Sequence, residues 1–197
     1  MTFLRKQLLL LTIFSLLAIS PCVAQNLDRF DEKVRQWAVE CRSEVSAQFN
    51  LLLTSGQLSV PQLFDTFYIP IPNTDPQKFH TQYDIFSDGV VLPIIDKILG
   101  YDKRLVFVIA VDRNGYLPTH NSRYSRPLTD DVEENAKWNR TKRLFNDRTG
   151  LAAARNQEPY LLQRYSRDTG EIMSDLSIPI TIQNRHWGAV RIGYKQK

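Results

Sequence analysis

Residues 105–117 read LVFVIAVDRNGYL, and this stretch decides the fold. Its first seven residues are apolar and mostly β-branched or aromatic, which predicts a buried strand over 105–111. Asp112 to Gly115 follow with Asn-Gly at their centre, a strong signal for a tight hairpin turn. We therefore expect a return strand over 116–120 and a β-hairpin in the middle of the chain.

The C-terminal part of the sequence also has strand patterns. Three further strands are predicted at residues 160–167, 171–182 and 187–194. A long crossover over 121–158 joins them to the hairpin, and we expect a helix over 139–154 within it. Hairpin-linked strands run antiparallel, so we predict an α+β domain: a five-stranded antiparallel sheet with helices segregated from it. Long excursions such as this crossover usually line or cover a binding site.

Helical patterns dominate the N-terminal half. Apolar residues recur at spacings of three and four from 26 to 53, which predicts an amphipathic helix of about seven turns. Residues 60–76 contain four prolines and are interpreted as a short helical turn followed by an extended segment. Residues 77–99 return to a helical pattern, bent by a glycine and a proline, and Gly100 is the expected stop.

The first 24 residues have the order of a secretory signal peptide. Two cations come first, then an apolar run over 8–20, then small residues up to Ala24. We predict cleavage near Ala24, which makes the protein periplasmic or secreted. An uncleaved anchor and a lipidated Cys22 are the alternatives, and Pro21 disfavours the second.

Composition and charge argue against several classes of function. The formal net charge of +4 falls to +2 when the two cations of the signal leave, which is too mild to suggest a nucleic-acid partner. Cys41 then stands alone and is interpreted as a small buried hydrophobe. His80, His120 and His186 are not spaced as metal ligands, and no Gly-x-Ser-x-Gly elbow or phosphate-cradling loop occurs. We therefore predict no metal, no cofactor and no enzyme.

Residues 138–150, WNRTKRLFNDRTG, concentrate positive charge within the crossover. Four cations and two aromatics share this segment with a single acid, Asp147. Arginine forks bind carboxylates through two hydrogen bonds, and aromatics supply apolar walls, so the segment fits an anion pocket. Two structural alternatives stay open. On a helix, Arg143 would pair with Asp147, and Arg148 would belong to a helix end capped by Gly150.

Several blocks of sequence, in a fixed order, carry a family resemblance. They are LPTHN (117–121), NRTKRLFNDRTG (139–150), PYLLQ (159–163), RDTGE (167–171), DLSIPI (175–180), RHWGA (185–189) and RIGY (191–194). Together they resemble the extracytoplasmic single-Cache sensor domain of bacterial methyl-accepting chemotaxis receptors. The resemblance covers roughly residues 60 to 194. It implies a PAS-like fold with a long first helix and a five-stranded sheet, and a pocket between that sheet and the segments after the second strand.

The resemblance also implies a function. Such domains commonly bind small organic acids, amino acids or similar metabolites, so we predict a sensory module that binds a polar or anionic metabolite reversibly. The expected organisation is a signal peptide over 1–24, a long helix over 25–59 and a ligand-binding domain over 60–197. Because the sequence stops three residues after the last predicted strand, at Lys197, we expect ligand binding without the receptors' own signalling part.

We predict seven ligand-binding residues, mostly in the crossover and the strand after it. Arg143 and Arg148 are the expected anion partners. The polar wall groups are His120, Tyr160 and Gln163, and the apolar wall groups are Trp138 and Phe145. The alternative function is a structural or partner-binding protein with a vestigial pocket, which associates through its long helix with a membrane receptor or a second copy. A secreted enzyme of unrecognised chemistry is a third possibility.

Overall fold

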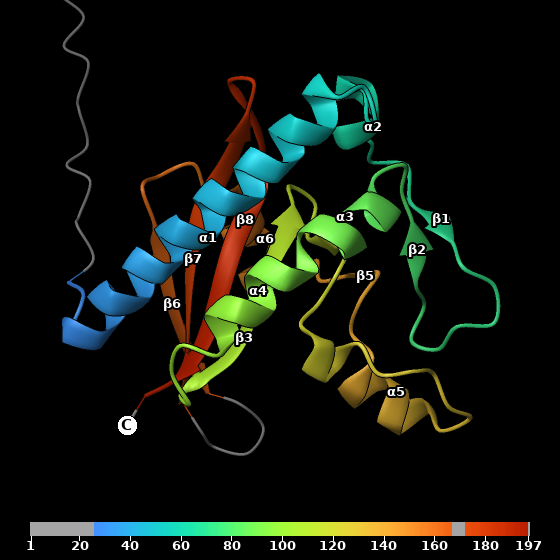
Figure 1. Cartoon of the computed structure of the whole chain (residues 1–197). Helices are drawn as coiled ribbons and strands as arrows, with labels where there is room; N and C mark the ends of the chain where they lie inside the picture. Colours follow the sequence, from blue (N-terminus) through green and yellow to red (C-terminus); the bar gives the residue numbers. More distant parts are fainter. Residues whose placement is uncertain (1–25, 167–171, 197) are drawn as a thin grey trace, which may run out of the picture.

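The structure, a computed structural model, describes residues 26–166 and 172–196 (Figure 1). The predicted signal peptide and the junction between the strands predicted at 160–167 and 171–182 lie outside the described residues. Within them, a long helix runs diagonally across an antiparallel sheet, and the shorter helices lie beside and behind that sheet. None of the described helices combines the length and the apolar character needed to cross a membrane.

Helix α1 (Arg29–Thr54) confirms the predicted first helix. Asp28 caps its N-terminus by accepting hydrogen bonds from two backbone N–H groups, and Asp31 completes a capping box. Its buried side chains follow the helical spacing seen in the sequence and include Val34, Cys41 and Phe49. This stripe packs against β7 and β8. The apolar face of α1 is therefore used within the chain.

The main sheet among the described residues has four antiparallel strands. Their order is β3 (Leu105–Asp112), β8 (Arg185–Lys195), β7 (Ile172–Ile182) and β6 (Leu161–Ser166). Within the described residues, the strands predicted at 105–111, 160–167, 171–182 and 187–194 are thus found as neighbours in one antiparallel sheet, with β3 and β6 at its two edges.

The predicted fifth strand of this sheet is not found among the described residues. The return segment after the hairpin turn is β4 (Tyr116–Leu117), which pairs with β5 (Arg143–Leu144) instead of β3. Asn121 explains part of this difference, because its side-chain oxygen accepts the Val108 backbone N–H at 2.8 Å. The Asn121 side chain thereby takes the Val108 N–H, to which the backbone of a full return strand would otherwise bond. Pro118, within the expected return strand, also has no N–H to donate.

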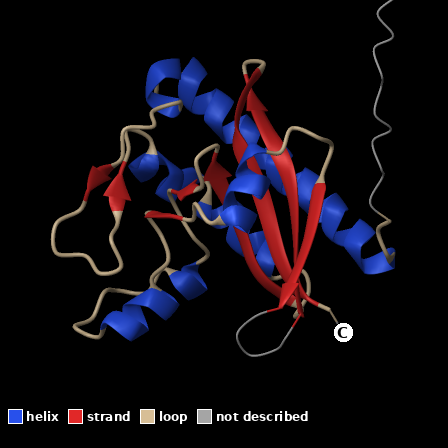
Figure 2. Ribbon diagram, turned by 180° about the vertical axis from the view of Figure 1, so that it is seen from behind, coloured by secondary structure: helices blue, strands red, loops and turns tan. Residues whose placement is uncertain are grey.

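The two faces of the sheet carry different cores. Side chains alternate along each strand, so Val190 and Ile192 of β8 enter the larger core, which α1 and α4 (Leu92–Leu99) cover. The opposite face carries a smaller cluster that includes Ile109 and Val111 of β3. Helix α6 (Arg148–Arg155) contacts β7 and β8 from that side, as the two opposite views show (Figures 1 and 2).

The region before β3 differs in part from its prediction. The short turn is α2 (Val60–Leu63), but the extended segment forms β1 (Ile69–Pro70), which pairs with β2 (Phe79–His80). The prediction of one bent helix over 77–99 is wrong at its start, because helix begins only with α3 (Asp84–Val90). Gly100 does cap α4, and its N–H bonds back to the last turn.

The prediction of one helix over 139–154 is also wrong. Helix α5 (Val132–Trp138) ends before this stretch, β5 lies inside it, and α6 begins only at Arg148. Lys142 has a positive φ of 58°, and Asp147 caps α6 by accepting the N–H groups of Thr149 and Gly150. Gly150 is therefore in the first turn of a helix. A Cβ there would lie 2.2 Å from the Phe145 carbonyl oxygen, so close approach requires the glycine.

Candidate functional site

A cavity of about 470 Å³ lies between the sheet and the crossover. The sheet side of its wall comes from β3, β6, β7 and β8, and the other side comes from the chain between β4 and the first turn of α6. The apolar and aromatic part of the lining is Val106, Phe107, Ile109, Leu117, Phe145 and Met173. Its size is within the range of sites for small organic molecules.

Two consecutive residues of β3, Val106 and Phe107, reach this cavity because β3 is irregular at Val106, whereas Phe107 shares a face with Ile109 by ordinary alternation. The pairing register with β8 shifts between Leu105 and Phe107, and both Val106 and Phe107 line the cavity. The ring lies against Gly193 of β8, where a Cβ atom would come within 2.1 Å of the Phe107 ring. A glycine opposite a bulge therefore lets an aromatic ring lie close to the sheet.

His120 is a buried polar group in the wall of the cavity. It is 3% exposed, and its Nδ1 has no hydrogen-bond partner within the described chain. Its ring lies between those of Phe107, at 6.4 Å, and Tyr124, at 4.9 Å. Burial, and after it the positive charges of Arg140 and Arg143, lower the pKa of His120 from 6.5 to about 3. The imidazole is therefore neutral at ordinary pH and can donate one hydrogen bond and accept another.

A side-chain network holds His120 in place. The next residue, Asn121, bonds to the β3 backbone and donates to Asp96 of α4 at 3.2 Å. Asp96 also accepts the Ser122 backbone N–H at 3.0 Å. The segment that carries His120 is thus fixed to both the sheet edge and a helix.

Two arginines line the cavity. Arg140 approaches from the crossover, and its guanidinium lies 5.1 Å from the centre of the Phe145 ring. Arg191 approaches from β8, is 6% exposed and forms a buried ion pair with Asp175 of β7. The Arg191 charge is therefore matched within the fold. The remaining polar lining is His120, Tyr124, Asp147, Thr149, Tyr165 and Ser166.

Of the seven predicted site residues, His120 and Phe145 line the cavity. Trp138 lies behind that wall, because its ring stacks on Tyr124 at 5.9 Å. Gln163 donates to the Thr149 carbonyl at 3.0 Å and so ties β6 to the start of α6. Tyr160 packs against the larger core on the other side of the sheet.

The two predicted anion partners lie outside the lining. Arg143 donates to the Ala136 carbonyl at 3.1 Å, and the predicted helical pairing with Asp147 is wrong because this stretch is not helix. Burial and the charge of Arg140 lower the pKa of Arg143. Arg148 is exposed at the first position of α6.

The sequence reasoning missed Arg140, Arg191 and Phe107 as lining residues. Arg140 lies within residues 138–150, the segment that was expected to form an anion pocket. The sequence could have indicated Arg191, because it is a charged residue within an otherwise apolar predicted strand. Phe107 shares a face with Ile109 and Val111 by strand alternation, but the sequence does not show which face of β3 lines the cavity.

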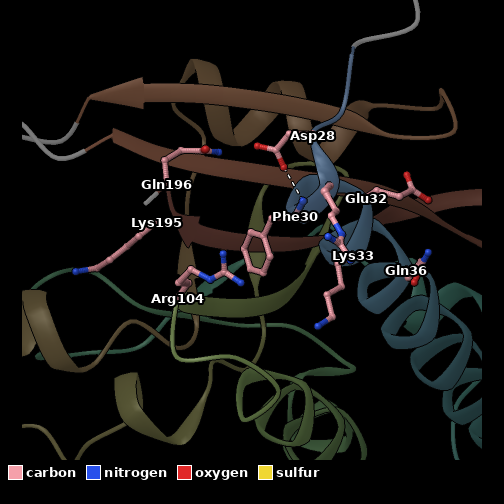
Figure 3. A pocket seen from close by; sticks show the side chains of 9 residues that line it. Asp28, Phe30, Glu32, Lys33, Gln36, Arg104, Lys195 and Gln196 are labelled. Carbon is pink, nitrogen blue, oxygen red and sulfur yellow. Dashed lines mark hydrogen bonds between the residues drawn. The ribbon is translucent and has the colours of Figure 1, made fainter.

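A second hollow, of about 770 Å³, lies at the N-terminal end of α1 (Figure 3). Its lining includes Phe30, Lys33 and Arg104, and the Arg104 guanidinium lies 3.3 Å from the centre of the Phe30 ring. The charged groups here are partly exposed and bonded to near neighbours: Arg104 pairs with Asp102, and Glu32 pairs with Arg35. We therefore take the sheet–crossover cavity, with its buried polar group, as the candidate site.

Comparison with known proteins adds little to this geometry. No protein-family model matches the chain, and no curated protein matches it. The chain is similar to a solved structure described as an extracellular ligand binding receptor from Desulfohalobium retbaense DSM5692, at 12% identity and a TM-score of 0.38. The match covers 86% of this chain and 26% of that one, so the chain spans about a quarter of the receptor. A likeness this weak assigns neither family nor function.

Proposed function

We propose that this protein is an exported sensory module that binds a small polar or anionic metabolite reversibly in the sheet–crossover cavity. The observation that carries the proposal is a buried polar group, His120, in a cavity large enough for a small molecule. Buried polar atoms are nearly always hydrogen-bonded, and a ligand would supply the partner that Nδ1 lacks within the described chain.

Binding would use a few polar groups within mostly apolar walls. Arg140 offers a guanidinium that matches a carboxylate, and the neutral imidazole of His120 offers a donor and an acceptor. Phe107, Phe145 and Ile109 would exclude water from the bound molecule. A site of this kind holds its ligand through a small number of oriented hydrogen bonds.

The exported, sensory part of the proposal is supported by the sequence. The first 24 residues have the order of a signal peptide, and blocks between 117 and 194 resemble single-Cache sensor domains of chemotaxis receptors. We propose that the protein binds organic acids or amino acids, is not an enzyme, and passes its signal through a membrane receptor or as a homodimer. The burial of the apolar face of α1 against the sheet favours ligand binding over the alternative of association through that helix.

A thermal-shift screen followed by calorimetry tests the proposal. The panel holds amino acids, aliphatic mono- and dicarboxylates and aromatic carboxylates. Val106→Trp places a large ring at a partly exposed lining position and should abolish binding. Val132→Trp makes the same change on the exposed face of α5 and should leave binding unchanged. Folded protein that responds to no compound, or binding that Val106→Trp leaves intact, would overturn the proposed site.

A further inference from the structure

We propose that the ligand of the sheet–crossover cavity is a planar aromatic carboxylate. Its ring would pack against Phe107 and Phe145, and its single carboxylate would bind the guanidinium of Arg140. This inference rests on the proposed function and narrows it to one chemical class.

The lining is unusually rich in rings, and they come from separate parts of the chain. They are Phe107, His120, Tyr124, Phe145 and Tyr165. The rings that contact one another meet at an angle: Phe107 and His120 are 74° apart, and His120 and Tyr124 are 57° apart. Aromatic pairs favour such edge-to-face and tilted arrangements, so a flat ligand ring would add one more favourable partner.

The position of Phe107 is specifically built. Strand alternation places the ring on the cavity face together with Ile109, and Gly193 leaves the space that the ring occupies. Every other residue at 193 would bring a Cβ within 2.1 Å of the ring and displace it. Strand β3 and strand β8 thus cooperate to present one aromatic surface at the floor of the cavity.

The charges around the cavity favour one anionic group. Arg140 and Arg143 lie 5.1 and 5.2 Å from the centre of the Phe145 ring. Within the described residues, Asp175 pairs with Arg191, and Asp147 accepts two N–H groups at the start of α6. Guanidinium groups therefore lie on the crossover side of the cavity. A guanidinium fork binds a carboxylate there with two hydrogen bonds.

The same rings limit how many charges the ligand carries. The face of an aromatic ring is electronegative and repels a carboxylate, so the acid group is restricted to the end of the cavity beside Arg140. A dicarboxylate would place its second charge against Phe107 or Tyr124. The volume also argues against very small acids, because about 470 Å³ equals the share of roughly fifteen waters at about 30 Å³ each. One ring or two fused rings with a carboxylate fit this space.

Titration calorimetry with matched compounds tests the inference. Benzoate and indole-3-acetate should bind, whereas benzyl alcohol lacks the charge and cyclohexanecarboxylate lacks the planar ring. Succinate and phenylalanine stand for the dicarboxylate and zwitterion classes. We expect at least one aromatic carboxylate to bind at least tenfold more tightly than each of these four compounds.

Variants of one arginine identify the carboxylate partner. Arg140→Gln should weaken the binding of the aromatic carboxylate at least tenfold. Arg140→Lys should lose less affinity, because lysine keeps the positive charge although it lacks the planar guanidinium that makes two hydrogen bonds. Arg155→Gln removes an equal charge from the exposed last turn of α6 and should leave affinity unchanged. Circular dichroism and the thermal midpoint confirm that each variant is folded.

The outcomes separate the inference from the proposed function. Tighter binding of succinate, abolished by Val106→Trp, would overturn the aromatic ligand and leave the binding function standing. Tighter binding of phenylalanine would overturn the claim that a carboxylate is the ligand's single charged group. Equal binding of cyclohexanecarboxylate would overturn the planar requirement, and an unchanged affinity in Arg140→Gln would overturn the assigned partner. Binding of no compound in the wider panel would overturn both proposals.

Discussion

His120 should make the stability of the fold depend on pH in a predictable direction. Its pKa falls from 6.5 to about 3 on folding because the ring is buried and faces the positive charges of Arg140 and Arg143. Below pH 6.5 the unfolded chain therefore binds a proton that the native state does not bind. The free energy of unfolding must then fall as pH decreases from about 6.5 towards 3.

The size of this effect follows from the two pKa values. Each pH unit below the unfolded pKa costs about 1.4 kcal/mol, so at pH 5.0 the loss from His120 is about 2 kcal/mol, and at pH 7.5 it is close to zero. For a chain of this length, 2 kcal/mol corresponds to about 4–8 °C in the thermal midpoint. The His120→Gln variant has no titrating ring, so its free energy of unfolding should not fall by this amount.

The assay is urea unfolding of both proteins at pH 7.5 and pH 5.0, followed by tryptophan fluorescence without ligand. All other titrating groups are common to the two proteins, so the difference between their pH-dependent changes isolates His120. The variant should lose about 2 kcal/mol less than the wild type between the two pH values. Equal losses in the two proteins would refute the claim that this imidazole is buried and neutral.

Four further substitutions test the scaffold, each by urea unfolding. Asp31→Ala removes half of a capping box and the acceptor for the buried Tyr194 hydroxyl, and should cost about 2–4 kcal/mol. Asp112→Asn disturbs a buried carboxylate that accepts four hydrogen bonds at the hairpin turn, and should also cost about 2–4 kcal/mol. Gly188→Ala places a Cβ 1.9 Å from a backbone oxygen of the neighbouring strand and should cost about 2–3 kcal/mol. Gly89→Ala, with nothing within 4 Å in α3, should instead gain about 0.5–1 kcal/mol, and a loss as large as that at Gly188 would contradict the packing.

Local periodicity explains which parts of the fold could be predicted from the sequence. The apolar run before Asp112 and the stripe along α1 are set by neighbours in the sequence, and both elements are found. The crossover could not be predicted in the same way. Its path depends on contacts from distant segments, such as the bond from the Val108 backbone to Asn121 and the close approach of Gly150 to Phe145.

The candidate site could also be predicted only in part from the sequence. His120 and Phe145 were found because the crossover was expected to line a pocket. Which arginine faces that pocket depends on backbone conformation at Lys142 and on the start of α6, and both are set by tertiary contacts. Arg143 and Arg148 were chosen for their place in the crossover, whereas Arg140 of the same segment lines the cavity.

The most direct test of the proposed binding cavity is the NMR spectrum of the His120 imidazole during titration with benzoate, and then with each compound that the thermal-shift screen identifies. The ring is buried in the cavity wall, so it reports binding at this place. Our proposal predicts that the His120 ring signals shift and saturate at the same ligand concentrations as the calorimetric binding curve. Saturable binding that leaves the His120 signals unmoved would contradict it.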